Sequence, residues 1–258
     1  MSDRKHHIIV SLFNKAVVEF DMLPYEFWPE EGQSFYEPEV SNTMARFVRP
    51  GDFVIDAGAN IGWFSVILSR MVGNEGLVLA FEPDPRNFEV LEQNLSLNKI
   101  ENVQAVEAAL CDKDRNMKFW MMEHGGYSSF IRYKNHLSSK DMLARSLDSL
   151  LATCKHLTPR VIKLDCEGAE EAILRGAEEV LRRGVDCVIV EFNFQILESD
   201  RRIRDFMRDL GYDFFFIRKD GIAKPIFLDP AYGMVSSNIN TINVLFSTKE
   251  KVAQAWAE

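Results

Sequence analysis

The segment DAGANIG, residues 56–62, constrains the fold more than any other stretch of the chain. An apolar run precedes it, and another apolar stretch begins at Trp63. Paired glycines at such a junction are typical of a sharp turn between a buried strand and a helix. The segment therefore predicts a strand over 53–57, a helix over 62–71 and a ligand-binding turn between them.

The chemistry of this turn differs from that of a dinucleotide-binding loop. The G-x-G-x-x-G pattern would need a middle glycine, and the chain has Asn60 between Gly58 and Gly62. Asp56 adds a negative charge that disfavours a phosphate and favours a ligand with an amino group or a sulfonium. We expect Gly58 to let the ligand approach the backbone and Gly62 to let the helix pack on the strand. The alternative is a plain turn in which Asn60 caps the helix.

Apolar runs and amphipathic helical patterns alternate through the rest of the chain. This alternation predicts a single α/β domain, with a mostly parallel sheet and helices on both of its faces. Residues 117–121 alternate only weakly between apolar and polar. The further strands are expected at 77–82, 103–108, 161–165, 187–191, 212–217 and 241–246, and the helices at 85–98, 146–151, 169–182 and 200–210.

Residues 1–50 differ in character from the rest of the chain. One or two short strands are expected within 8–20, an irregular lid within 24–38, and a helix over 40–48 that ends before Pro50 and Gly51. We therefore divide the chain into an N-terminal arm or lid, residues 1–50, and a ligand-binding domain, residues 51–258.

Composition excludes several classes of protein. The 258 residues are 47% hydrophobic and 27% charged, which is typical of a globular domain, and the net charge of −9 argues against an extended nucleic-acid-binding face. The apolar runs are too short for membrane insertion, and the N-terminus is not a convincing signal peptide. The four cysteines show no CxxC spacing, so we expect reduced thiols, no zinc and a cytoplasmic location. A homo-oligomer remains compatible with these features.

The second motif is FEPDP, in which Glu82 ends the second strand of the predicted sheet. In nucleoside-binding sheets, an acid at the end of the second strand, after a glycine turn at the end of the first, accepts hydrogen bonds from the two ribose hydroxyls. Pro85 then opens the following helix at a favourable position. The alternative is an acid that merely complements the dipole at a helix start, but its combination with the glycine turn favours the ribose.

Four segments together resemble a known family: VIDAGANIGWFSVILS, LAFEPDPRNFEVLEQNLSLN, RSLDSLL and VIKLDCEGAEEAILRGAEEVL. In this order they are similar to the FkbM-type S-adenosylmethionine-dependent methyltransferases, over about residues 51–192. The resemblance implies the class I methyltransferase fold, a Rossmann-like sheet of seven mostly parallel strands in which the last strand is antiparallel. It also implies S-adenosylmethionine as cofactor and methyl transfer, most often to a hydroxyl of a sugar, lipid or natural product.

The methionine end of the cofactor is assigned to residues near the first strand. Asp56 and the backbone of Ala57, Gly58 and Asn60 are expected to face the methionine portion. Glu37, in a segment similar to a Glu-bearing segment ahead of the family's first strand, is expected to meet the amino group if the arm folds over.

The nucleoside end is assigned to residues after the second and third strands. Glu82 is expected to hold the ribose, and Pro83 and Asp84 to flank the adenine. The family places further adenine contacts at the end of the third strand, where the candidates here are Glu107 and, second, Asp112. Many class I enzymes have an aspartate in this region, so the chain departs from the pattern there.

The KLDCEGAE motif is expected to form the reacting centre. Lys163 and Asp165 alternate onto one face of a strand, and Asp165 emerges at its carboxyl edge, close to the cofactor's methyl group. Glu167 follows at a helix start, and we assign Asp165 and Glu167 active-site roles. Glu170 is interpreted as part of a solvated first turn. The role of Lys163, pairing with a carboxylate or catalysis, stays open.

Transfer to oxygen requires an aligned acceptor and benefits from a general base. The candidate bases are Asp165, Glu167, Glu191 and the loop residue His124. Asp165, Glu191 and Asn193 would make an oxygen-rich set suited to Mg²⁺ if they converged, but we expect no resident metal.

Two other functions remain open alternatives to methyl transfer to a small-molecule acceptor. A nicotinamide-dependent oxidoreductase could use a related sheet, although the missing middle glycine and Asp56 argue against it. A non-catalytic nucleoside-binding module could keep the fold without the chemistry, although the intact acids argue against that.

Overall fold

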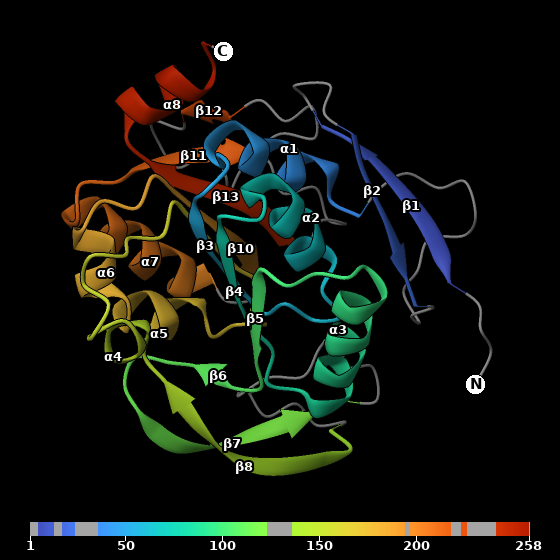
Figure 1. Ribbon diagram of the computed structural model, residues 1–258. Helices are drawn as coiled ribbons and strands as arrows, with labels where there is room; N and C mark the ends of the chain where they lie inside the picture. The colour runs from blue at the N-terminus through green and yellow to red at the C-terminus, as the bar shows by residue number, and fades with distance from the viewer. Residues whose placement is uncertain are drawn as a thin grey trace.

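The computed structural model describes residues 5–12, 17–23, 36–122, 136–193, 197–217, 223–225 and 241–257. Among these residues the main sheet has eight strands in the order β12-β11-β13-β10-β9-β3-β4-β5 (Figure 1). Its strands are β3 (Phe53–Ala57), β4 (Leu77–Phe81), β5 (Val103–Val106), β9 (Val161–Leu164), β10 (Cys187–Asn193), β11 (Asp213–Ile217), β12 (Ala223–Pro225) and β13 (Thr241–Ser247).

The pairing of these strands confirms the expected fold class. β3 pairs in parallel with both β4 and β9, and the parallel arrangement continues to β5 and β10. β13, the last strand in the chain, lies antiparallel between β10 and β11. The seven-stranded, mostly parallel sheet of the class I methyltransferase fold is therefore present, with the short strand β12 added antiparallel at one edge.

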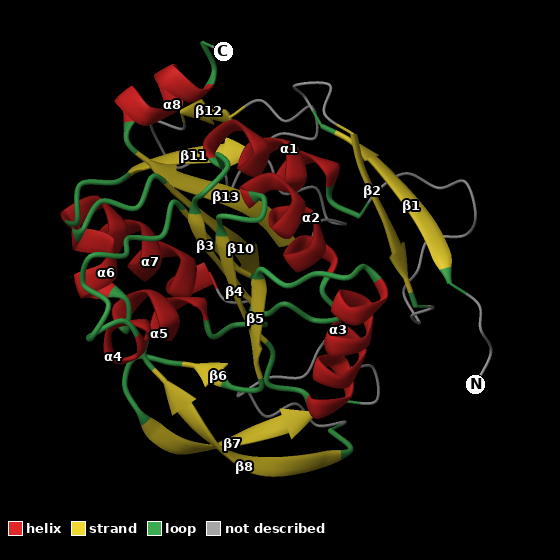
Figure 2. Ribbon diagram, viewed as in Figure 1, coloured by secondary structure: helices red, strands yellow, loops and turns green. Residues whose placement is uncertain are grey.

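Helices cover both faces of the sheet, as Figure 2 shows. Within β3, Val54 belongs to one hydrophobic cluster and Ile55 to another, because successive side chains point to opposite faces. The first cluster includes residues of α1, α2 and α8, with Leu91 and Leu95 of α3, and the second includes residues of α5, α6 and α7. The helices are α1 (Pro38–Phe47), α2 (Trp63–Val72), α3 (Pro85–Leu97), α4 (Leu147–Leu150), α5 (Glu170–Arg175), α6 (Glu178–Arg182), α7 (Leu197–Asp209) and α8 (Lys249–Ala255).

Two smaller sheets flank the main one. β1 (His6–Ser11) and β2 (Val17–Met22) form an antiparallel hairpin, which confirms the strands expected within 8–20. Val10 and Phe20 of this hairpin are buried in the same cluster as α2. The other sheet has the order β6-β8-β7 and is made of β6 (Ala109–Leu110), β7 (Arg115–Met121) and β8 (Ser138–Arg145).

The segment 169–182 was expected to be one helix, and this is wrong. The structure has α5 and α6 instead, separated at Gly176. A Cβ atom at Gly176 would lie 2.1 Å from the carbonyl oxygen of Cys111, so the chain passes too close to that loop for a side chain. A new N-terminus then forms, where the Asp148 carboxylate accepts hydrogen bonds from the amides of Glu179 and Val180.

Several elements were not predicted, namely β6, β8, β12 and α8. The mainly polar sequence SSKDMLAR of β8 lacks a clear alternation, and most of the strand is exposed. Most of the expected lid, residues 24–35, lies outside the described residues. Within the described part of the chain, no helix has the length and apolar character needed to cross a membrane.

Candidate active site

The turn after β3 is bonded to the end of β4. The amides of Gly58 and Ala59 both donate to the carbonyl oxygen of Phe81, at 3.0 and 2.9 Å. The amide of Asn60 donates to Oε2 of Glu82 at 2.8 Å. Asn60 has a φ of +51°, in the left-handed region, so these bonds hold it in an uncommon conformation. The first and second sequence motifs therefore form one structural unit.

Both glycines of the turn make room for other parts of the protein, and the approach of a ligand to Gly58 remains a prediction. A Cβ atom at Gly58 would lie 1.8 Å from the carbonyl oxygen of Asp165, so Gly58 makes room for the protein's own backbone at the end of β9. A Cβ atom at Gly62 would lie 2.5 Å from Cδ1 of Leu91, so Gly62 makes room for α3. Gly62 is also the residue before α2 and gives no side-chain cap, which rules out Asn60 as that helix's N-cap.

Glu82 is 5% exposed, and its carboxylate is held by several donors. Oε1 accepts from the amide of Asp84 at 2.9 Å and from Nδ2 of Asn87 at 3.4 Å, while Oε2 binds Asn60. Burial raises the pKa of Glu82 to about 7, although these hydrogen bonds oppose the shift. Asp84 caps α3 and pairs with Arg86, and the helix begins at Pro85 as expected.

Asp56 is the second-last residue of β3, and its side chain is fully buried. Its Oδ2 accepts from the hydroxyl of Ser65 at 2.6 Å, and its Oδ1 accepts no hydrogen bond from the described residues. Burial raises the pKa of Asp56, and the charge of Lys163 opposes the shift. Asp56 thus faces a lysine and a hydroxyl inside the protein.

Lys163 is 1% exposed and lies among acids. Its Nζ is 3.2 Å from Oδ2 of Asp165 and 4.6 Å from the centre of the Phe64 ring. Burial alone would lower the pKa of Lys163, but the charges of Asp165, Asp56 and Glu37 together raise it. The alternation along β9 correctly indicated that Lys163 and Asp165 share a face, and the structure shows that they pair.

Glu37 lies beside this group although it precedes α1. Its Oε1 accepts from Nδ2 of Asn243 at 2.8 Å, and its buried Oε2 accepts no hydrogen bond from the described residues. Burial and, second, the charge of Asp165 raise the pKa of Glu37 to about 7. Asn243 is on β13 directly opposite Glu191 of β10. No sequence signal pointed to Asn243, because it comes from a strand outside the motifs.

Three of the four candidate bases converge at the carboxyl edge of the sheet. Carboxylate oxygens of Asp165, Glu167 and Glu191 all lie within 4.8 Å of one another, close enough to hold a metal ion. Burial raises the pKa of Glu167 to about 8, and the charges of Asp165 and Glu170 add to the shift. His124 and the side chain of Asn193 lie outside the described residues.

The expectation that Glu170 is solvated is wrong. Its side chain is buried, and Oε1 accepts from the amide of Cys166 at 2.8 Å and from that of Gly168 at 3.2 Å. The neighbouring Glu171 instead pairs with Arg175 of α5 and with Arg202 of α7. The Glu170 carboxylate is buried because it accepts from amides of the loop that precedes α5, and residue type alone does not reveal such a contact.

The two candidates for the adenine contact have other partners. Glu107 is exposed and pairs with Lys140 of β8 at 2.8 Å. Asp112 pairs with Arg115, between β6 and β7. Pro83 is half-buried next to Glu82, at the end of β4. The roles of Glu107 and Pro83 at the adenine remain predictions.

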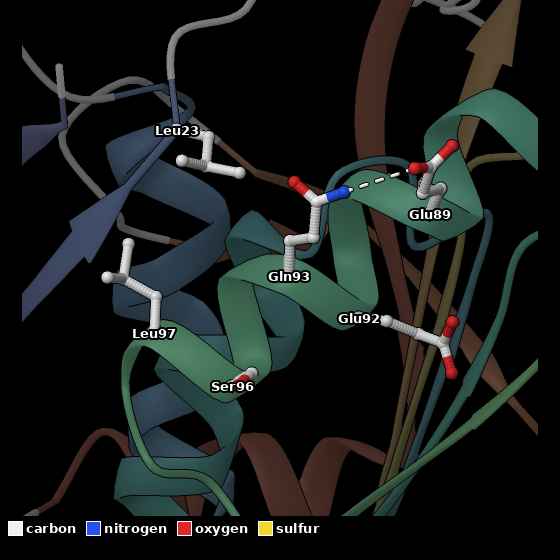
Figure 3. Close-up of a pocket in the computed structure, with 6 residues that line it drawn as sticks. All are labelled: Leu23, Glu89, Glu92, Gln93, Ser96 and Leu97. Carbon is white, nitrogen blue, oxygen red and sulfur yellow. Dashed lines mark hydrogen bonds between the residues drawn. The ribbon is translucent and has the colours of Figure 1, made fainter. Parts of the chain in front are cut away.

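A separate hollow lies on the outer face of α3 (Figure 3). Its volume is about 580 Å³, and Gln93 donates to Glu89 within it at 3.3 Å. It includes none of the candidate site residues and lies apart from the carboxyl edge of the sheet. The lining residues are Leu23, Glu89, Glu92, Gln93, Ser96 and Leu97.

The residues at the carboxyl edge fit a cationic nucleoside cofactor. Three buried oxygens, Oδ1 of Asp56, Oδ1 of Asn60 and Oε2 of Glu37, accept no hydrogen bond from the described residues. Such oxygens match the amino group and hydroxyls of S-adenosylmethionine, since buried acceptors without donors are costly. The surrounding acids favour its positive charges.

Comparison with known sequences agrees with this geometry. A family model described as the methyltransferase FkbM domain matches residues 56–214. "Methyltransferase 1" of Beauveria bassiana is 28% identical over 159 residues, which cover 54% of this chain and 64% of that protein. "Methyltransferase sdnD" of Sordaria araneosa is 27% identical over 192 residues, covering 62% of this chain and 73% of the relative.

Comparison with solved structures supports the fold. The crystal structure of methyltransferase FkbM from Methylobacillus flagellatus matches with a TM-score of 0.51 and 14% identity. The match covers 85% of this chain but 46% of the other protein. The chain thus spans less than two thirds of the length of that protein and of the Beauveria relative.

Proposed function

The chain belongs to the FkbM methyltransferase family, and we propose that it transfers a methyl group from S-adenosylmethionine to a hydroxyl oxygen of a small molecule. The single observation that carries the choice of acceptor atom is the convergence of Asp165, Glu167 and Glu191 within 4.8 Å. A hydroxyl loses its proton as the new bond forms, and grouped carboxylates provide a base for that proton.

The residues around the turn after β3 would hold the cofactor, which supplies an electrophilic methyl group on its sulfonium when bound. Glu82 would accept from the ribose hydroxyls, since each carboxylate oxygen has room for more than one donor. Glu37 would accept from the amino group through Oε2, which has no donor among the described residues. Asp56 and Asp165 would contribute negative charge near the sulfonium.

The acids at the end of β9 and β10 would act on the acceptor. Asp165 or Glu167 would orient the hydroxyl and take its proton, and Glu191 would bind a second polar group of the acceptor. Glu167 suits proton transfer, because its pKa of about 8 lies near neutral pH, so that a minor ionised fraction accepts the proton at pH 7 and a larger one above pH 8. Lys163 would keep Asp165 in place through their 3.2 Å ion pair.

An exposed aromatic residue next to these acids favours an acceptor with a sugar or an aromatic ring. Tyr36 is 47% exposed and contacts the rings of Trp63 and Phe64, at centroid distances of 6.2 and 5.9 Å. Its chain neighbour Glu37 reaches into the acidic group. Aromatic faces pack against the apolar faces of sugars and rings alike.

We further propose a cytoplasmic enzyme that acts on neither nucleic acid nor membrane. The net charge of −9 and the four free cysteines support this assignment. We also retain the division into an arm, residues 1–50, and a methyltransferase domain, residues 51–258. The link between Glu37 and Asn243 supports an arm that closes on the domain.

The test is a panel of hydroxylated sugars, lipids and phenols incubated with S-adenosylmethionine and analysed by mass spectrometry. A mass gain of one methyl group on an oxygen supports the proposal, whereas transfer to nitrogen or carbon contradicts the choice of atom. Thermal melting with S-adenosylhomocysteine and with NADH separates the alternatives. A shift with NADH alone favours the oxidoreductase, and cofactor binding without any transfer favours the non-catalytic module.

A further inference from the structure

We propose that Glu170 is a positioning residue, whose carboxylate fixes the loop that presents Glu167 to the acceptor. The inference rests on the proposed function in one respect, namely that Glu167 works at the transfer centre. Glu170 itself touches neither reacting atom in this assignment. It acts on the backbone on both sides of Glu167.

The hydrogen bonds of Glu170 bracket Glu167. Oε1 of Glu170 accepts from the amide of Cys166 at 2.8 Å and from the amide of Gly168 at 3.2 Å. These are the residues directly before and after Glu167 in the chain. Oε1 of Glu170 therefore holds the backbone on both sides of Glu167, the candidate base.

The backbone conformation of residues 166–168 explains why these two hydrogen bonds are needed. Glu167 has a φ of +51° and Gly168 a φ of +97°. The left-handed region is uncommon for a residue with a side chain, and it persists where surrounding bonds determine it. Without the Glu170 carboxylate, the amides of Cys166 and Gly168 would lose their acceptor. The backbone of Glu167 would then relax to a negative φ. Its carboxylate would then leave the group with Asp165 and Glu191.

The surroundings of Glu170 are built to hold this carboxylate. Glu170 is 6% exposed and is the first residue of α5, where the helix dipole stabilises a negative charge. Burial raises the pKa of Glu170, and its hydrogen bonds with backbone amides oppose the shift. An acid that only capped a surface helix would stay near water, so its burial against this loop indicates a fixed geometry.

Three substitutions of Glu170 separate the effect of its hydrogen-bonding geometry from the effect of its charge. Glu170→Gln keeps an oxygen at the same reach and should preserve the loop. Glu170→Asp keeps the charge but is one methylene shorter, so it cannot reach both amides. Glu170→Ala removes the acceptor altogether. Glu179→Ala is the matched control, since Glu179 is an exposed acid in the first turn of the next helix.

The direct measurement is residue-resolved hydrogen exchange at the amides of Cys166 and Gly168. We expect exchange to speed up by about tenfold or more in Glu170→Ala and Glu170→Asp, and to stay near the wild-type rate in Glu170→Gln and the control. Unchanged protection in a folded Glu170→Ala protein overturns the inference. If Glu170→Ala does not fold, Glu170→Asp decides in its place.

The functional measurement uses the hydroxylated acceptor that the wild-type protein methylates best. We expect kcat to fall by about 10- to 100-fold in Glu170→Asp and Glu170→Ala, with KM for S-adenosylmethionine little changed and with rescue in Glu170→Gln. Wild-type kcat in a folded Glu170→Asp protein contradicts the positioning role. If the wild-type protein methylates no acceptor, the proposed function fails, and hydrogen exchange still decides whether Glu170 holds the loop.

Discussion

The backbone amide of Asn60 donates a 2.8 Å hydrogen bond to the carboxylate of Glu82. This bond joins the turn after β3 to the end of β4, so that two distant motifs of the sequence meet at one edge of the sheet, where we propose that the cofactor binds. The glycines of the turn make room for the backbone of Asp165 and for Leu91 of α3, which bring their elements close to the turn. Cofactor affinity and turnover are both expected to depend on this edge.

Removing the Glu82 carboxylate is expected to weaken cofactor binding. Glu82→Ala should reduce the affinity for S-adenosylhomocysteine by on the order of 1.5–3 kcal/mol, because charge-assisted hydrogen bonds to the ribose are lost. Calorimetry measures the change, with Glu89→Ala on the exposed side of α3 as the control. An unchanged affinity in a folded Glu82→Ala protein would show that the ribose is bound elsewhere.

Cofactor affinity is expected to rise with pH between about 6 and 8. The pKa values of Glu82 and Glu37 are each raised to about 7, so both carboxyls are protonated below that pH and ionised above it. The ionised forms accept hydrogen bonds from the ribose and the amino group more strongly. Calorimetric titration of S-adenosylmethionine across this range provides the measurement. Glu82→Gln, which stays neutral, should reduce the pH dependence, and an equally steep profile in that variant would exclude Glu82 as its source.

Asp165 is expected to matter far more for turnover than for stability. Asp165→Asn should lower kcat by on the order of 10²-fold if Asp165 is the base. Turnover and thermal melting are measured in parallel, with the exposed Asp141→Asn on β8 as the control. Near-normal turnover in a folded Asp165→Asn protein would move the base to Glu167 or Glu191, or to His124.

Methyl transfer is expected to proceed without a divalent metal ion, even though Asp165, Glu167 and Glu191 converge. The Lys163 ammonium already pairs with Asp165, and Glu167, with its pKa raised to about 8, is largely neutral at pH 7. Both effects reduce the negative charge available to a cation. Turnover in EDTA should stay within about twofold of the untreated enzyme. A loss that Mg²⁺ restores would assign these three acids as metal ligands instead.

A further prediction concerns stability and the buried acid Asp200 of α7. Asp200 is 3% exposed, and burial, followed by the charge of Glu170, raises its pKa from 3.8 to about 7. The folded state therefore binds more protons than the unfolded state between these values. The stability that the protonated group contributes is complete below about pH 4 and is lost as the pH rises through about 7.

Asp200→Asn removes this dependence, because the amide is neutral at every pH. The variant should be more stable than the wild type at pH 8 by on the order of 2 kcal/mol and nearly equal to it at pH 4. Urea unfolding at the two pH values measures the difference, with the exposed Asp209→Asn as the control. Equal stabilities at pH 8 would mean that Asp200 titrates as an ordinary surface acid.

The sequence predicted the parts of the fold that depend on neighbouring residues. Buried parallel strands are continuous apolar runs, so β3 and β4 were located to within a residue. Gly176 shows the limit of such local patterns, since a single glycine in an amphipathic pattern gave no sign that the helix divides there. The division results from the close approach of the Cys111 carbonyl, which belongs to a distant loop.

The candidate site likewise has residues that local sequence patterns predicted and one that they missed. Local patterns were sufficient to place Asp56, Glu82 and Asp165 at the carboxyl ends of parallel strands, because strand ends in such a sheet share one edge. The burial of Glu170 was missed, since its partners are amides and no residue type marks them.

What the sequence alone determined is the alternation of the parallel strands with helices and the chemical class of the residues at the strand ends, because both depend on short-range periodicity and turn chemistry. What only the tertiary structure decided is which side chains meet. Glu37 and Asn243 are 206 residues apart in the chain and form a 2.8 Å hydrogen bond. That contact exists because β13 inserts antiparallel next to β10, and the folded sheet alone brings such distant residues together.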